Sequence, residues 1–168
     1  MRQFEQTLGV VENIDTTSRQ LKDALESGKT IIVTTLQKFP VIAREIGELP
    51  GKRFALIVTR SRLHAVRYKL ALDRYLAERS YPFKALVAFS GTVQDGGQSY
   101  TESGMNGFPE AQTAKTFEQP DYRFLIVANK FQTGFDQPLL HTMYVDKKLG
   151  GVNAVQTLSR LNRTHPEK

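Results

Sequence analysis

The hydrophobic positions of the chain gather in short apolar runs, and the stretches between these runs show helical spacing. The runs lie at Thr30–Thr34, Lys52–Thr59, Lys84–Phe89, Phe124–Ala128 and Thr142–Val145. Their length is typical of buried strands and too short for most helices. Alternating strands and helices predict an α/β fold, with a mainly parallel sheet and helices on both of its faces.

The longest helical pattern runs from Ser61 to Ser80, with Ser61 as its N-cap. Its apolar stripe is expected to contain Leu63, Val66, Leu70, Leu72 and Leu76. It is also the most basic stretch of the chain, with Arg60, Arg62, Arg67, Lys69, Arg74 and Arg79. Most of these charges are expected to form a solvated face, and one or two could neutralise phosphates.

Residues 95–108 are rich in glycine and polar residues and are expected to form one long irregular segment. Tyr100 and Phe108 are expected to anchor this segment rather than to stack on a base. A short helix is then expected at Glu110–Glu118. Its inward-facing residues are expected to be Ala111, Ala114 and Phe117.

Composition is that of a soluble globular chain. Its 168 residues are 40% hydrophobic and 24% charged, with a net charge of +6 and a pI of about 9.6, which favour an anionic partner. The absence of cysteine excludes disulfides and thiolate metal sites. The three histidines are too scattered for a metal cluster, and no metal site is expected. No signal peptide is visible, and no apolar run approaches the roughly 20 residues of a membrane span, so a cytoplasmic location without membrane contact is expected.

The candidate chemistry concentrates in the C-terminal third of the chain. The apolar run Phe124–Ala128 leads into a polar turn with Gly134 and Asp136, and a later helical stretch places Gln156, Arg160 and Arg163 on one face. Arginine offers a planar fork of donors that matches phosphate oxygens. Either feature alone is common, as a turn or as a solvated helix face, but their order and proximity point to phosphate recognition.

These two features resemble motifs V and VI of the superfamily 2 helicases and translocases. The segments VANKFQTGFDQPLLHTMYVDKKL and VQTLSRLNRTHP are similar to the second motor domain of the R (motor and endonuclease) subunit of type I restriction enzymes. The earlier segment IIVTTLQKFP resembles part of the first motor domain. The resemblance therefore implies a RecA-like fold. Residues 1–58 would come from motor domain 1 and residues 59–168 from motor domain 2, packed as one domain.

The resemblance also assigns roles to individual residues. It implies that Arg160 and Arg163 are catalytic and face the γ-phosphate of ATP, and that Gly134, Asp136 and Gln156 bind the nucleotide. The DNA contacts that it implies are Thr35, Lys38, Ser90, Gly91 and Thr133. The partners that the resemblance implies are duplex DNA and the modification and specificity subunits of a type I restriction-modification complex.

Several parts of such a motor are missing from the sequence. There is no Asp-Glu dipeptide and no Thr-Gly-Thr-Pro, and Gly28-Lys29-Thr30 is no phosphate loop because position 23 is Asp23 and the triplet opens a strand. No nuclease domain is recognisable. A fragment or an internal deletion would produce this pattern. The family implies ATP and Mg²⁺, but this chain is not expected to hold them, or to hydrolyse ATP, by itself.

Two alternatives remain open from the sequence. The chain could belong to another superfamily 2 enzyme, such as a chromatin-type remodeller or an RNA helicase. It could also be a non-enzymatic DNA-binding or protein-interaction module, a role that its missing motifs would suit.

Overall fold

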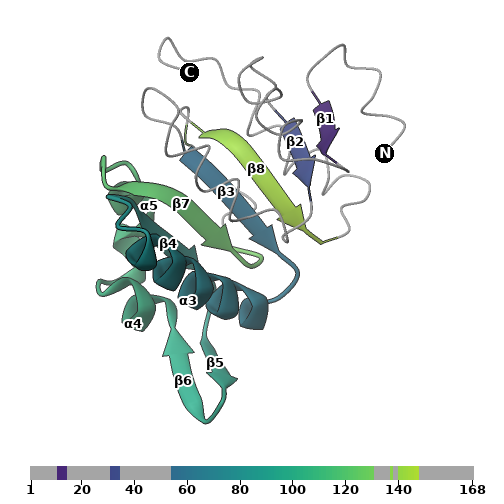
Figure 1. Cartoon of the computed structure of the whole chain (residues 1–168). Helices are drawn as coiled ribbons and strands as arrows, with labels where there is room; N and C mark the ends of the chain where they lie inside the picture. The colour runs from purple at the N-terminus through teal and green to yellow at the C-terminus, as the bar shows by residue number, and fades with distance from the viewer. Residues whose placement is uncertain (1–10, 15–30, 35–53, 131–136, 138–139, 148–168) are drawn as a thin grey trace.

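The structure is a computed structural model that describes residues 11–14, 31–34, 54–130, 137 and 140–147 (Figure 1). Its elements are β1 (Val11–Ile14), β2 (Ile31–Thr34), β3 (Phe54–Thr59), α3 (Arg62–Glu78), β4 (Lys84–Ala88), β5 (Thr92–Asp95), β6 (Gln98–Thr101), α4 (Glu102–Asn106), η2 (Glu110–Gln112), α5 (Thr113–Phe117), β7 (Tyr122–Val127) and β8 (Leu140–Asp146). Helices in these ranges lack the length and apolar character needed to cross a bilayer.

A four-stranded parallel sheet forms the centre of the fold, in the order β4-β7-β3-β8. A separate parallel pair, β1 and β2, lies with β2 beside β8 (Figure 1). The five apolar runs of the sequence correspond to β2, β3, β4, β7 and β8. The predicted α/β class with a mainly parallel sheet is therefore confirmed.

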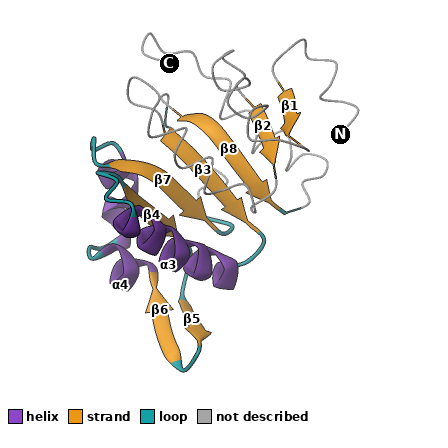
Figure 2. Cartoon of the chain, in the orientation of Figure 1, coloured by secondary structure: helices purple, strands orange, loops and turns teal. Residues whose placement is uncertain are grey.

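Both faces of this sheet are covered, which explains why its strands are apolar at consecutive positions. In β3, Ala55 and Ile57 pack into the core under α3, and Phe54, Leu56 and Val58 pack into the core on the opposite face. That second core contains Phe117 of α5. Helices thus lie on both faces, as predicted (Figure 2).

Strand β3 also contains the boundary at residue 58/59 that the resemblance suggests between the two motor-derived segments. The whole strand Phe54–Thr59 pairs with β8, and its residues 55–58 pair with β7. Residues before and after the boundary therefore share one sheet. The assignment of the two segments to different motor domains stays a prediction.

Helix α3 begins where the sequence predicts, but its buried face differs in part. Ser61 is the N-cap, and its side chain accepts a hydrogen bond from the backbone N–H of His64. The buried residues are Ala65, Val66, Lys69, Leu72 and Leu76. Leu70 is 42% exposed, so its predicted burial is wrong. At about 100° per residue Leu70 lies roughly 120° around the helix axis from Leu76, beyond the face that meets the sheet.

Residues 95–108 are regular, so the prediction of an irregular segment is wrong. Strands β5 and β6 form an antiparallel hairpin in which Asp95 pairs with Gln98, and α4 follows directly. The two turn residues, Gly96 and Gly97, have φ of 56° and 79°, which glycine adopts without steric cost. The hairpin extends away from the sheet (Figure 1).

Aromatic residues at either end of this region pack against the body of the domain. Tyr100 is partly buried against the core under α3, and Phe108 against the opposite core, which agrees with an anchoring role. The helix expected at Glu110–Glu118 is present as η2 followed by α5. Phe117 is buried and Ala114 partly buried, but Ala111 is exposed, because it lies in the 3-10 turn that precedes α5.

Candidate functional site

The carboxyl ends of the parallel strands β3, β4, β7 and β8 meet at one edge of the sheet, called the carboxyl edge below. In open α/β sheets, ligands bind at this edge. The residues that follow these strands lie there and begin with Arg60, Phe89, Ala128 and Lys147. The carboxyl edge is therefore the candidate functional site.

Thr59 and Ser61 fix the β3 end of this edge. The buried Thr59 hydroxyl lies 2.9 Å from the carbonyl oxygen of Val127 and 3.0 Å from that of Ser61, which joins the ends of β3 and β7. The Ser61 hydroxyl lies 2.7 Å from Nδ1 of His64. Together these contacts set the position at which α3 starts.

Arg62 connects the β3 end to the β4 end. Its Nη1 donates a 2.8 Å hydrogen bond to the carbonyl oxygen of Ser90. Gly91 has φ of +75°, and a Cβ added there would lie 3.1 Å from Nη1 of Arg62. Arg62, Ser90 and Gly91 are all exposed. The structure thus places an arginine beside Ser90 and Gly91, the two predicted DNA contacts in the described ranges.

A second polar group joins β3, α3 and β8. Tyr68 donates a 2.5 Å hydrogen bond to Oδ2 of Asp146, and Arg60 forms a 3.3 Å salt bridge with the same oxygen. Desolvation and the hydrogen bond to Asp146 raise the pKa of Tyr68 to about 12. Arg60 is 58% exposed and Asp146 is 23% exposed. Asp146 therefore neutralises part of the positive charge at this edge and holds the Arg60 side chain.

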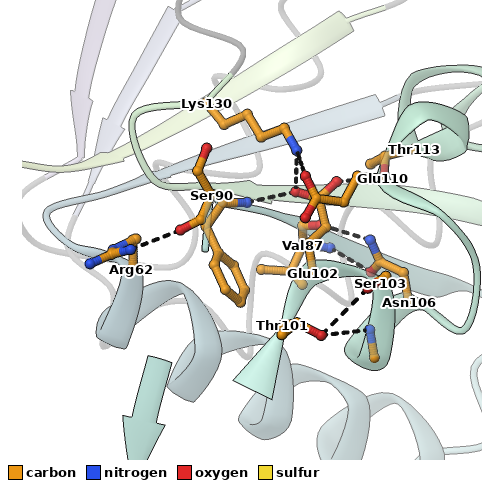
Figure 3. Close-up of polar contacts among 12 residues, drawn as sticks. Arg62, Val87, Ser90, Thr101, Glu102, Ser103, Asn106, Glu110, Thr113 and Lys130 are labelled. Atoms are coloured by element: carbon orange, nitrogen blue, oxygen red, sulfur yellow. Dashed lines mark hydrogen bonds and ion pairs between the residues drawn. The ribbon is translucent and has the colours of Figure 1, made fainter. Parts of the chain in front are cut away.

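The third group lies between the ends of β4 and β7 (Figure 3). Glu102 is fully buried, and its carboxylate accepts hydrogen bonds from the Phe89 N–H at 2.8 Å and from the Thr113 hydroxyl at 2.6 Å. Nζ of Lys130 lies 2.8 Å from Oε2 of Glu102 and 2.6 Å from Oε2 of Glu110. Desolvation of Lys130 is outweighed by these two carboxylates, and the pKa of Lys130 is raised.

The outer edge of β4 is covered by side chains of α4. Asn106 accepts from the Val87 N–H at 3.0 Å and donates to the Val87 carbonyl oxygen at 2.8 Å (Figure 3). Glu102, one helical turn earlier in α4, accepts a hydrogen bond from the N–H of Phe89. Helix α4 thereby satisfies backbone groups that an edge strand would otherwise present to another chain.

Most of the predicted site residues lie outside the described residues: Thr35, Lys38, Thr133, Gly134, Asp136, Gln156, Arg160 and Arg163. Sequence reasoning missed Glu102 and Lys130 and did not select Arg62. The Arg60-Ser61-Arg62 triplet directly after an apolar strand is the signal that could have identified Arg62. Within the described ranges, no three His, Asp or Glu side chains come together as metal ligands.

Comparison with known proteins gives a consistent result. Residues 94–168 match the family described as type I restriction enzyme subunit R domain 3. The chain is 30% identical to a putative type I restriction enzyme MjaVIIP endonuclease subunit of Methanocaldococcus jannaschii, over an alignment of 131 positions, gaps included, that covers 68% of this chain and 12% of the relative. A second putative subunit of that organism, MjaIXP, is 26% identical over an alignment of 174 positions, gaps included, which covers 99% of this chain and 16% of the relative.

A shorter match adds a bacterial relative. The chain is 39% identical to the type I restriction enzyme HindI endonuclease subunit of Haemophilus influenzae, over an alignment of 62 positions, gaps included, that covers 35% of this chain and 6% of the relative. The chain therefore spans only a small part of the length of the curated relatives that it matches. No solved structure matches it significantly. The resemblance seen in the sequence is confirmed by these matches.

Proposed function

The chain is a relative of the R subunits of type I restriction enzymes, and we propose that it is part of an ATP-dependent DNA translocase and restriction motor of that kind. In this role it supplies the arginine-bearing wall of the ATP cleft and a surface that contacts the DNA backbone. The family match over residues 94–168 supports the proposal, since it contains Gly134, Asp136, Gln156, Arg160 and Arg163.

The observation that carries the DNA-contact part is the pairing of Arg62 with the Ser90-Gly91 segment at the carboxyl edge. The guanidinium is exposed yet held by the Ser90 carbonyl oxygen at 2.8 Å. It stands at the first residue of α3, where the positive end of the helix dipole favours an anion. A phosphate that approaches this point meets an exposed arginine whose guanidinium is hydrogen-bonded to the end of β4.

In the ATP cleft, the proposed roles fall on residues of the C-terminal segment. Arg160 and Arg163 would face the γ-phosphate, Gln156 would order their helix, and Gly134 and Asp136 would couple nucleotide to DNA. Arginines supplied across a cleft stabilise the charge that develops during phosphoryl transfer.

The family implies ATP and Mg²⁺. The described residues contain no cluster of three possible metal ligands, and the sequence has no phosphate loop, so we assign neither ligand to this chain alone. The other wall of the cleft would come from a first motor domain. Duplex DNA and the modification and specificity subunits are the proposed partners, in the cytoplasm.

The DNA-contact proposal is tested by the salt dependence of binding to duplex DNA. Each phosphate contact contributes about −0.9 to the slope of log K against log salt concentration. Arg62→Ala should weaken binding and make this slope shallower by about 0.9. Arg74→Ala is the matched control, because Arg74 is exposed on the same helix, about 18 Å from Arg62. Equal effects of the two variants would show that only net charge matters.

The ATP-cleft proposal is tested by turnover of the purified chain, with and without long duplex DNA and Mg²⁺. We expect no turnover in either condition. Turnover that DNA stimulates and that Arg163→Ala abolishes would mean that the chain holds a complete phosphate site, and the proposal of half a cleft would be wrong.

A non-enzymatic DNA-binding module is the second candidate, and the missing phosphate loop favours it. The two candidates differ in what the Gln156–Arg163 face does. The motor proposal places Arg160 and Arg163 at the γ-phosphate of ATP, so it requires DNA binding to survive the changes Arg160→Ala and Arg163→Ala. Binding that survives would show that this face is not the DNA site. A different superfamily 2 enzyme is disfavoured by the match to type I restriction enzyme subunit R.

A further inference from the structure

A cavity of about 390 Å³ lies at the outer edge of β4 and is bordered by α3 and α4. It is called the edge cavity below. Its volume is within the range of about 300–1,000 Å³ that is typical of ligand pockets. The edge cavity lies at the amino end of β4, whereas the candidate functional site lies at the carboxyl edge. None of the predicted site residues lines it.

The backbone of β4 faces β7 at alternate residues. The N–H of Lys84 donates a 2.7 Å hydrogen bond to the carbonyl oxygen of Asp121. The carbonyl oxygen of Ala88 accepts one of 3.1 Å from the N–H of Ala128. The register shift in this pairing adds a residue to β7 and not to β4, so the alternation along β4 is unbroken. The N–H and C=O of Ala85 therefore face outward, away from β7.

Side chains of α4 cover the outward-facing backbone only in part. Asn106 bonds both the N–H and the C=O of Val87, and Glu102 accepts from the N–H of Phe89 (Figure 3). Ala85 is the next outward-facing residue, and it lines the edge cavity. Among the residues that the structure describes, none bonds its outward N–H or C=O. The edge cavity thus holds a short piece of strand edge with which a further extended chain can pair.

The charges in the edge cavity favour an acidic occupant. Its lining includes two lysines, Lys69 and Lys84, and one aspartate, Asp73. The Lys69 side chain is 8% exposed, and its ammonium is bonded to Asp73, which is 45% exposed. An ammonium has three donors, and Asp73 is the partner of Lys69 within the described ranges. Donors of a largely buried cation therefore remain for a carboxylate of the occupant.

An aromatic wall completes the edge cavity and is also bordered by cations. The rings of Tyr81 and Phe83 stack with their centroids 6.3 Å apart. The ammonium of Lys84 lies 5.8 Å from the ring centroid of Tyr122, and the guanidinium of Arg123 lies 5.4 Å from that of Phe83. Positive charge at this wall favours an acidic segment over a basic one.

We propose that the edge cavity is a docking site for a short, extended, acidic segment of a partner protein. The segment pairs with the backbone of Ala85 as an added strand and places a carboxylate at Lys69. A peptide offers Ala85 both a donor and an acceptor, whereas the phosphates of DNA offer acceptors alone. This role goes beyond the proposed motor function and does not depend on it, since it uses no residue of the ATP cleft or of the carboxyl edge.

Residue-resolved amide exchange of the 168-residue chain is the first test. The N–H of Ala85 should exchange at least about tenfold faster than those of Val87 and Phe89, which α4 side chains hold. If Ala85 is protected as strongly as Val87, the strand edge is already closed, and the proposal is wrong.

Binding of the synthetic peptide acetyl-Thr-Glu-Thr-Glu-Thr-Glu-amide, followed by amide chemical shifts, is the second test. We expect the peptide to bind at millimolar concentration and to slow exchange of the Ala85 N–H. The same peptide with lysine in place of glutamate, or N-methylated at every residue, should not bind. No binding of the acidic peptide would overturn the proposal. Equal binding of its N-methylated form would also overturn it, because the edge cavity would then take carboxylates without strand pairing.

A variant pair tests the role of Lys69. Lys69→Met should weaken peptide binding about tenfold, the effect of one hydrogen bond to a charged group. It leaves no buried charge unpaired, because Asp73 is 45% exposed. Arg74→Met is the matched control: Arg74 is exposed, does not line the edge cavity and lies about 140° around the helix axis from Lys69. Equal losses in the two variants would show that only net charge matters and would refute a specific site.

Competition with duplex DNA separates this inference from the proposed function. Excess duplex DNA should not displace the acidic peptide, and Lys69→Met should leave DNA binding unchanged. Displacement by DNA would assign this surface to nucleic acid and overturn the docking proposal. If the chain binds the peptide but no DNA, the proposed DNA contact is wrong and the docking site stands.

Discussion

Gly91 has a left-handed backbone conformation and lies in the candidate DNA surface. We therefore expect Gly91→Ala to lower both stability and DNA affinity, and a matched control variant to separate these two effects. The φ of Gly91, +75°, lies in the left-handed region, where an alanine costs about 1–2 kcal/mol. The new Cβ would also lie 3.1 Å from Nη1 of Arg62. Because Nη1 is the end of a flexible, exposed side chain, it should move away and lose its hydrogen bond to Ser90.

Gly97→Ala is the matched control for this substitution. Gly97 has nearly the same φ, +79°, but a Cβ there would meet nothing within 4 Å. Both variants should therefore lose about 1–2 kcal/mol of unfolding free energy from backbone strain. The excess loss in Gly91→Ala should be at most about 1 kcal/mol, the contribution of one exposed hydrogen bond.

The assay pairs chemical denaturation, which measures this strain, with binding to labelled duplex DNA. We expect Gly91→Ala to reduce DNA affinity and Gly97→Ala to leave it unchanged, although both lose similar stability. In an Arg62→Ala background, Gly91→Ala should have no further effect on affinity, because the side chain that it displaces is gone. Equal loss of affinity in the two glycine variants, or a full additional loss in the Arg62→Ala background, would refute the reasoning.

Two further predictions concern α3. Leu72→Ala should cost about 2–5 kcal/mol of unfolding free energy, because Leu72 is 2% exposed in the core, whereas Leu70→Gln should change it by less than about 0.5 kcal/mol; equal costs by chemical denaturation would contradict the observed helix face. The raised pKa of Tyr68 means that its phenol is favoured in the folded state, so its contribution to stability should be complete below about pH 10 and decline as pH rises toward about 12. Spectrophotometric titration of the wild type and Tyr68→Phe should assign the late-titrating phenol, and a Tyr68 that ionises near pH 10 would be incompatible with its contact to Asp146.

Some site residues are marked by a local motif, whereas others are recognised only by a contact with a residue far away in the sequence. Ser90 and Gly91 were predicted as DNA contacts because a motif resemblance marks them, and the structure shows them exposed at the carboxyl edge. Their neighbour Arg62 is 28 positions away, and so is Lys130 from Glu102. A sequence pattern relates residues that are close to one another in the chain. It therefore could not show that these side chains form pairs.

Local sequence determined the elements whose signal is contained in a few adjacent residues. Strands β3, β4, β7 and β8 are apolar at consecutive positions since both faces of their sheet are covered, and Ser61 caps α3 through its own neighbour His64. The hairpin had only the Gly96-Gly97 turn as its signal, because its strands are largely exposed and lack an apolar alternation. Tertiary structure alone decided that Leu70 lies outside the buried face of α3, which strands are neighbours, and that the buried Glu102 meets Lys130. These outcomes depend on packing and on the cost of burying charge, which no single segment of the sequence contains.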